Sequence, residues 1–242
     1  AESIRLVDVS SGSFRMGSPS GGEDTAAERP VHAVTLTSFS MSAKEITQAQ
    51  FRRVMGVNPS VNKGENLPVE RVSWIDAASF CNRLSDAAGL SRCYDEKSWK
   101  CDFTRDGFRL PTEAEWEYAC RAGGVTEYYS GDDEADLGRA GWYRGNCMKS
   151  QVGGLKEPNE WGLYDMHGNV WELCNDWYDE SYYAKSPKIS PVGPATGKRK
   201  VLRGGSWTHV AHGCRSADRW SIDPGEKYGN VGFRIVRRPG TI

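Results

Sequence analysis

Glycine constrains this chain more than any other residue, because its 27 positions are spread evenly from end to end. Long helices and regular sheets tolerate few glycines, since a residue without a side chain loses the most backbone freedom on folding. Nine Trp and ten Tyr accompany them, and large aromatic side chains anchor a loop-rich core well. We therefore expect an α+β fold rich in irregular structure. No repeat or linker divides the sequence, so a single domain is expected over residues 1–242.

Local patterns predict short regular elements in the first half of the chain. Residues 4–17 and 30–36 carry the alternation and turn residues of strands. Helices are expected after Thr47, Ser73 and Thr112, because each can cap a helix whose apolar residues recur on one face.

Charge and hydropathy exclude two classes of partner. Thirty-one basic and 32 acidic residues leave a formal charge of -1 with no long run of one sign, which argues against nucleic acid. Every apolar stretch is far shorter than the roughly 18 residues that span a bilayer, so no membrane-spanning segment is expected. Ala1–Ser3 is not a signal peptide, although a removed leader or lipid anchor would leave no trace.

The seven cysteines form no C-x-x-C pair, which argues against a structural zinc site. Cys93 and Cys101 flank an expected hairpin, so a disulfide between them is compatible with its geometry. The odd total leaves at least one thiol unpaired.

The densest motif runs from Gly162 to Glu172. The carboxylates of Asp165 and Glu172, with the carbonyls of Gly168 and Val170 between them, are oxygen ligands of the kind that calcium prefers. Calcium usually takes six or more oxygens, so spacing alone favours a tight turn with two solvated acids.

Enzyme signatures are few. The pair His209-x-x-His212 is a weak metal signal in a segment without helical period, and a chance pair is the simpler interpretation. Cys214 is a nucleophile only if a base lies near it, and the sequence assigns none.

The C-terminal end combines short motifs with intervening residues that show no strand or helix periodicity. Residues 202–207 (LRGGSW), 214–217 (CRSA) and 231–234 (VGFR) enclose two stretches, 208–213 and 218–230, with no strand or helix period. Trp220, Ile222 and Tyr228 are unusual in a bland loop and suggest contact with a partner. An ordinary surface loop remains the alternative.

Several sequence motifs, taken together, resemble those of the formylglycine-generating enzyme (sulfatase-modifying factor) family. They span nearly the whole chain: 14–18 (FRMGS), 45–48 (EITQ), 109–119 (RLPTEAEWEYA), 162–172, 203–207 and 232–234. The resemblance implies a C-type lectin-like fold of that family's subtype. It also implies a calcium site on Asp165, Gly168, Val170 and Glu172.

The chain departs from that family where its chemistry is expected. The family's enzymes use two cysteines, four residues apart, with copper and oxygen, and the stretch that holds them has no counterpart between Trp207 and Cys214. No copper is therefore expected. In the family the cysteine matching Cys214 pairs with the one matching Cys120, so the resemblance implies a Cys120–Cys214 disulfide.

The non-enzymatic branch of the fold is more similar. The chain resembles the variable proteins of Treponema, whose C-terminal residues are rewritten by diversity-generating retroelements that mutate template adenines. Most unpatterned residues are reachable from an AAC codon by adenine changes, whereas Trp220, Glu226 and Lys227 are not. We expect a variable ligand-binding region at about 204–234.

The sequence thus favours a ligand-binding display protein, exported to the cell surface with or without a lipid anchor, that binds an unknown protein or surface ligand. An oxidase or metal-dependent modifying enzyme using Cys214, His209 and His212 is the alternative, and an accessory domain packed on another subunit is a third. The expected ligand-binding residues are Thr208, His209, Val210, His212, Gly213, Asp218, Trp220, Ser221, Ile222, Gly225, Tyr228, Gly229 and Asn230.

Overall fold

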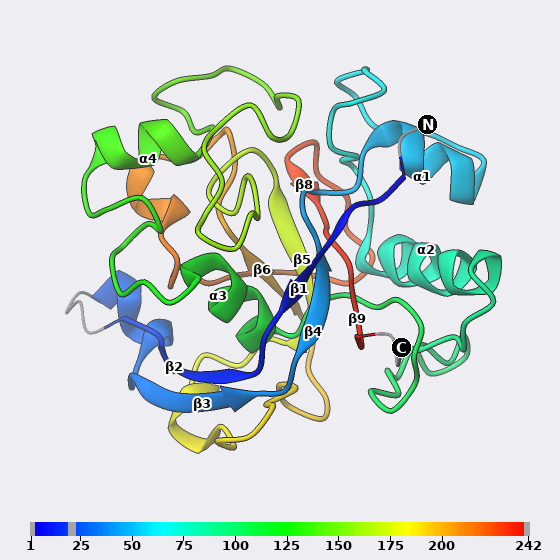
Figure 1. Ribbon diagram of the computed structural model, residues 1–242, viewed down its shortest axis with the longest axis horizontal. Helices are drawn as coiled ribbons and strands as arrows, with labels where there is room; N and C mark the ends of the chain where they lie inside the picture. The colour runs from blue at the N-terminus through cyan, green and yellow to red at the C-terminus, as the bar shows by residue number, and fades with distance from the viewer. Residues whose placement is uncertain (1–2, 19–22, 240–242) are drawn as a thin grey trace.

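The structure is a computed structural model that describes residues 3–18 and 23–239. Its elements are short and widely spaced (Figure 1). In chain order they are β1 (Leu6–Val9), β2 (Gly12–Met16), η1 (Glu23–Glu28), β3 (His32–Leu36), β4 (Phe39–Ser42), α1 (Gln48–Met55), α2 (Trp74–Ala87), α3 (Glu113–Arg121), α4 (Glu134–Ala140), β5 (Trp171–Trp177), η2 (Tyr182–Lys185), β6 (Lys200–Arg203), η3 (Ala211–Cys214), β7 (Trp220–Ile222), β8 (Val231–Gly232) and β9 (Val236–Arg237). The expected α+β class with much irregular structure is confirmed.

The C-terminal end of the chain supplies most of the largest sheet, whose strand order is β7-β6-β5-β8. β6 pairs antiparallel with β5, setting Glu172 opposite Arg203, while β8 pairs parallel with β5 through Trp171 and Val231. The other sheets are β1-β4-β9 and the hairpin β2-β3. Because β9 joins β4, both ends of the chain are tied into one sheet (Figure 1).

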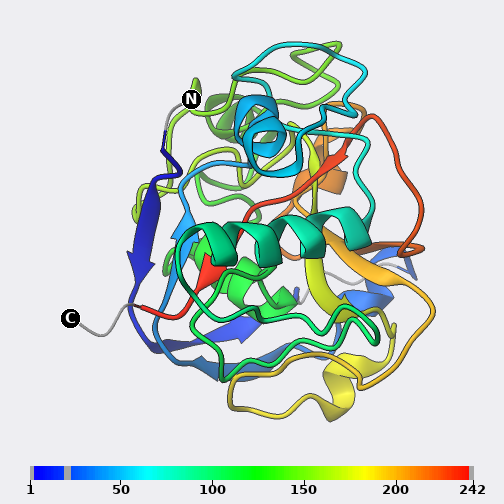
Figure 2. The same ribbon diagram turned by 90° about the vertical axis from the view of Figure 1, so that its right-hand side faces the viewer.

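The expected helices form where their caps predict them. Thr47, Ser73 and Thr112 each accept a hydrogen bond from the backbone N–H three residues on, and the side chain at that third position bonds back. These capping boxes satisfy N–H groups that a helix start leaves unpaired. Helices α1 and α2 lie together on one side of the molecule (Figure 2).

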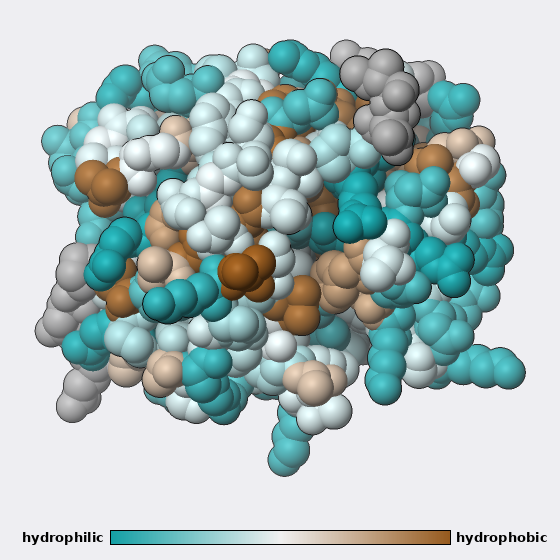
Figure 3. All heavy atoms as spheres, turned by 60° about the horizontal axis from the view of Figure 1, so that its bottom comes forward, coloured by the Kyte–Doolittle hydropathy of each residue, from teal (hydrophilic) through white to brown (hydrophobic). Residues whose placement is uncertain are grey.

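Aromatic side chains fill the core, as the composition predicts. Phe51 stacks on Phe80 with ring centroids 5.6 Å apart, and Phe233 meets both edge-on. The face in Figure 3 shows apolar residues in small groups among polar ones, so no broad apolar surface covers it. None of the described helices is long and apolar enough to cross a membrane.

Neither expected disulfide is formed, because all seven cysteines are free. Cys120 and Cys214 are separated by His167, whose Nε2 lies 3.8 Å from the Cys120 Sγ and whose Nδ1 lies 2.8 Å from the Cys214 carbonyl oxygen. In the hairpin, Cys101 pairs with Tyr94 rather than with Cys93. The register of the strands therefore does not place the two thiols opposite each other.

Candidate ligand-binding site

A cavity of about 320 Å³ lies against residues 204–234, which we call the C-terminal segment. Three parts of the chain form this C-terminal cavity. Its lining residues are Val61, Asn62, Glu70, Lys149, Ser150, Trp207, Thr208, Tyr228, Gly229 and Asn230. The volume lies at the lower end of the range for small-ligand pockets.

A network of polar side chains joins the two arms of the C-terminal segment. The Asn230 amide nitrogen donates to the hydroxyl oxygens of Thr208 and Ser206 at 3.0 and 3.1 Å. The His209 Nδ1 lies 3.0 Å from the Thr208 oxygen and 2.9 Å from the Ser206 oxygen. Burial, with Arg144 adding to it, lowers the pKa of His209, so its imidazole is neutral near pH 7. The network fixes residues 206–209 against residue 230.

Glu70 forms the acidic wall of the cavity. Its side chain is fully buried, and its Oε1 accepts hydrogen bonds from the backbone N–H groups of Val61 and Asn62, the latter at 2.9 Å. Its Oε2 is buried without a partner. Burial raises the pKa of this carboxyl, because the charged form loses contact with water.

Two aromatic side chains line the same cavity. Trp207 is half-buried, and its indole N–H is buried without a hydrogen-bond partner. Tyr228 is 49% exposed, and its backbone oxygen accepts from the Arg71 N–H at 2.9 Å. The backbone is thus held while the ring stays open to solvent.

Buried arginines hold the C-terminal segment and the strand before it to the rest of the protein. Arg203 and Arg219 form ion pairs with Glu117 and Glu113 of α3, and all four residues are at most 5% exposed. At the turn after β6, a Cβ on Gly205 would lie 2.4 Å from the Gly213 carbonyl oxygen, and its φ of +74° also favours glycine. The backbone around the cavity is therefore rigidly placed.

The cavity gathers some of the expected ligand-binding residues and leaves out others. Thr208, Tyr228, Gly229 and Asn230 line it, and His209 contacts Thr208. Elsewhere on the surface lie Val210, His212, Gly213, Trp220 and Gly225. Asp218 lies outside the cavity and is partly buried. Its carboxylate lies 3.5 Å from the Arg215 guanidinium, which also pairs with Glu28.

Two of the expected binding residues are wrong. Ser221 is 8% exposed and Ile222 is 1% exposed, where Ile222 packs in the core that contains Leu173 and Leu202. The reason is β7, which pairs Ser221 with Val201 and Ile222 with Lys200 as an outer strand of the sheet. Neither side chain is available to a ligand.

Sequence reasoning missed the half of the cavity that lies outside the C-terminal segment. Val61, Asn62, Glu70, Lys149 and Ser150 are more than fifty positions away in sequence. Only Glu70 carried a signal, because an acid between the apolar residues Val69 and Val72 predicts a buried carboxylate in need of partners.

Comparison with known proteins agrees with this architecture. Residues 2–239 match the model of the sulfatase-modifying factor enzyme 1-like domain. The chain belongs to this family. It is 37% identical over 206 residues to the formylglycine-generating enzyme of Streptomyces coelicolor, covering 78% of this chain and 58% of that protein. It is 33% identical over 241 residues to the serine/threonine-protein kinase Pkn1 of Chlamydia pneumoniae, covering 96% of this chain and 38% of that protein. The chain thus spans less than two thirds of either relative.

Among solved structures, Treponema denticola variable protein 1 is similar with a TM-score of 0.89 and 32% identity. The match covers 97% of this chain and 95% of that one. The expected C-type lectin-like fold of the sulfatase-modifying factor subtype and the relationship to a variable protein are therefore confirmed.

The calcium set implied by this family does not fit the residues present. Both Glu172 oxygens bind the Arg234 guanidinium, at 2.6 and 2.7 Å, and the Trp116 indole N–H donates to Oε2 at 2.7 Å. Three donors therefore already engage Glu172, two at Oε2 and one at Oε1. In the part of the chain that the structure describes, no group of three or more His, Cys, Asp or Glu side chains is arranged to hold a metal ion.

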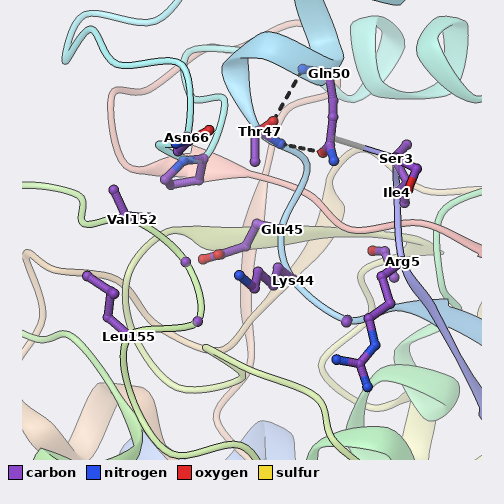
Figure 4. Close-up of a pocket in the computed structure, with 15 residues that line it drawn as sticks. Ser3, Ile4, Arg5, Lys44, Glu45, Thr47, Gln50, Asn66, Val152 and Leu155 are labelled. Atoms are coloured by element: carbon purple, nitrogen blue, oxygen red, sulfur yellow. Dashed lines mark hydrogen bonds between the residues drawn. The ribbon is translucent and has the colours of Figure 1, made fainter. Parts of the chain in front are cut away.

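The other acid of the implied calcium set, Asp165, lies near the carboxylate of Glu45. Its Oδ2 accepts from the Gly154 N–H at 2.6 Å, while its Oδ1 and the Oε1 of Glu45 are both buried without partners. Glu45 lies beside the loop that carries Val152 and Leu155 (Figure 4). Burial, reinforced by the neighbouring carboxylates, raises the pKa of Glu45 well above its usual value.

Proposed function

We propose that this protein binds ligands without catalysing a reaction, and that the C-terminal cavity is its binding site. One observation carries the proposal: Thr208, Tyr228, Gly229 and Asn230 line an open cavity on a backbone held from behind by buried ion pairs. The Tyr228 side chain can differ without changing the fold, because it is half exposed, whereas Thr208 and Asn230 also bind each other across the cavity.

A binding experiment tests this assignment. Labelled protein is applied to a peptide and glycan array, and each positive ligand is titrated against Tyr228→Ala and Asn230→Ala. Both substitutions are expected to weaken binding, whereas Val125→Ala, at a side chain 90% exposed outside the cavity, is the matched control. Ligands that bind all three variants equally would place the site elsewhere.

We further propose that a retroelement diversifies the exposed positions of the C-terminal segment. The support is the similarity to Treponema denticola variable protein 1 and the exposure of Val210, His212 and Tyr228. The neighbouring DNA tests it: a near-copy of the 3′ coding sequence that differs only at adenines, beside a reverse transcriptase gene, is expected.

An oxidase of the formylglycine-generating type is the second candidate, favoured by 37% identity to such an enzyme. Against it, Cys214 is the only cysteine of the C-terminal segment and its thiol is fully buried. His209 bonds Ser206 and Thr208 through its Nδ1, and the His212 Nε2 lies 3.2 Å from the Arg215 guanidinium. Copper titration decides: stoichiometric uptake that is lost in Cys214→Ser would favour the oxidase.

We also propose that the protein acts at the cell surface, since a protein with diversified binding residues needs ligands of outside origin. Protease treatment of intact cells, followed by detection of the protein, tests the location. Loss of the protein without lysis is the expected result.

A further inference from the structure

Glu70 gives the C-terminal cavity a carboxylate that the protein itself does not neutralise. The side chain is fully buried, yet only Oε1 is hydrogen-bonded. Within residues 3–18 and 23–239, Oε2 has no hydrogen-bond partner. A Cβ on Gly229 would lie 3.6 Å from Oε2, so this oxygen lies against the part of the C-terminal segment that lines the cavity.

The nearby cations do not supply the missing partner. Lys63 and Arg71 are the charges that act most on Glu70, but the Lys63 ammonium donates instead to the Asn58 carbonyl oxygen at 3.0 Å. Lys149 lies on the exposed side of the cavity. A buried acceptor without a donor is costly, and a ligand that brings a positively charged donor would remove that cost.

The aromatic lining favours the same ligand. Trp207 and Tyr228 both contribute to the cavity, and aromatic rings attract organic cations through their π faces. The Trp207 indole N–H is also buried without an acceptor. A complementary ligand therefore carries a cationic donor for Glu70 and a carbonyl-type acceptor for Trp207.

We propose that the C-terminal cavity takes up a lysine or arginine side chain of a protein ligand, with Glu70 as an anion that stays fixed while the exposed residue 228 changes. A peptide chain supplies both the cation and a nearby carbonyl oxygen. This inference rests on the proposed binding function, and it adds an anchor that lies outside the C-terminal segment. Diversified residues then select among partners that share a basic side chain.

Calorimetric titration with N-acetyl-L-lysinamide and its uncharged analogue N-acetyl-L-norleucinamide tests the anchor. The lysine probe is expected to saturate the protein and to bind at least roughly tenfold more tightly than the norleucine probe. Glu70→Gln should remove most of that difference. Its Oε1 can still accept from Val61 and Asn62, so the fold is expected to persist.

Glu65→Gln is the matched control, because it removes the same charge from an exposed side chain paired with Arg52. Equal binding of the two probes, or unchanged lysine binding in Glu70→Gln, would overturn the anchor. If Glu70→Gln does not fold, the indole N–H resonance of Trp207, assigned with Trp207→Phe, gives a second test. That resonance should shift with the lysine probe only.

The two proposals fail differently. If Tyr228→Ala and Asn230→Ala weaken binding of an array ligand but Glu70→Gln does not, the binding site stands and the anchor is wrong. If only Glu70→Gln weakens binding of the lysine probe, the anchor stands and the C-terminal segment is not the binding surface.

Discussion

Asp165 is a buried acid held in an unfavourable setting. Asp165 is 1% exposed and lies near Glu45 and Glu172. Its backbone φ is +54°, which Asn and Asp tolerate best among residues with side chains. Burial raises the pKa of Asp165 to about 6. In the unfolded chain the same carboxyl ionises near pH 4.

The sign of the pH effect follows from that difference. Below about pH 4 the carboxyl is protonated in both states, so its full contribution to stability is present. Between pH 4 and 6 the unfolded chain releases the proton first, and stability is lost as the pH rises. We expect Asp165→Asn to remove this loss and to raise the free energy of unfolding at pH 7.5 by on the order of 1–2 kcal/mol.

Urea unfolding of both proteins at pH 4.5 and 7.5 measures the effect, with exposed Asp106→Asn as control. The gain from Asp165→Asn should be larger at pH 7.5. A calcium experiment could contradict the prediction. If the wild type melts at a higher temperature with calcium than with chelator, and Asp165→Asn loses that increment, then Asp165 is a metal ligand and the prediction is wrong.

At the scale of elements, β7 shows which positions near the cavity belong to the core. Ile222 is buried against the main sheet, whereas Tyr228, six residues on, has a half-exposed ring. We expect Ile222→Ala to lower the free energy of unfolding by about 2–4 kcal/mol, because it leaves a core cavity. Tyr228→Ala should change it by no more than about 0.5 kcal/mol.

Chemical unfolding of the two variants measures this contrast directly. Val125→Ala serves as a second surface control. Similar destabilisation by Ile222→Ala and Tyr228→Ala would mean that the ring is packed in solution, and that residue 228 is unsuited to variation.

Features that depend on residues close together in the sequence were predictable, and features that depend on distant residues were not. The starts of α1, α2 and α3 were predictable because each capping box involves residues three positions apart. The strand β7 was not, since its existence depends on pairing with β6 some twenty residues away. The same limit hid Glu70 and Ser150, which reach the cavity only through the folded chain.

The fold class and the family relationship were predictable from motifs spread along the chain, whereas the partners of buried charges were not. Arg234 and Glu172 stand 62 positions apart, and nothing local shows that the arginine takes both oxygens of the acid. The implied calcium set includes Glu172, and no sequence pattern indicated its pairing with this arginine.

The whole molecule combines a deeply integrated C-terminal segment with a few open positions on it. β6 and β8 flank β5, and β7 pairs with the outer side of β6, so residues 200–232 cannot detach without dismantling the main sheet. Variation is therefore tolerable only where side chains leave the packed interior. Val210 and Tyr228 are about half exposed, and a Cβ on Gly225 meets no atom within 4 Å.

We expect the triple variant Val210→Asn, Gly225→Asn, Tyr228→Asn to fold as the parent does. Each exposed change should contribute at most about 0.5 kcal/mol, and distant sites add nearly independently, so the free energy of unfolding should fall by about 1.5 kcal/mol at most. For a chain of this size that is roughly a 3–6 °C fall in Tm. Phe233→Ala, a single change at a fully buried ring, should cost about 3–5 kcal/mol and so exceed the three together. Thermal melting of both proteins gives the comparison. A triple variant that melts below Phe233→Ala would show that the open positions also hold the segment in place, and the separation of scaffold from binding surface would be lost.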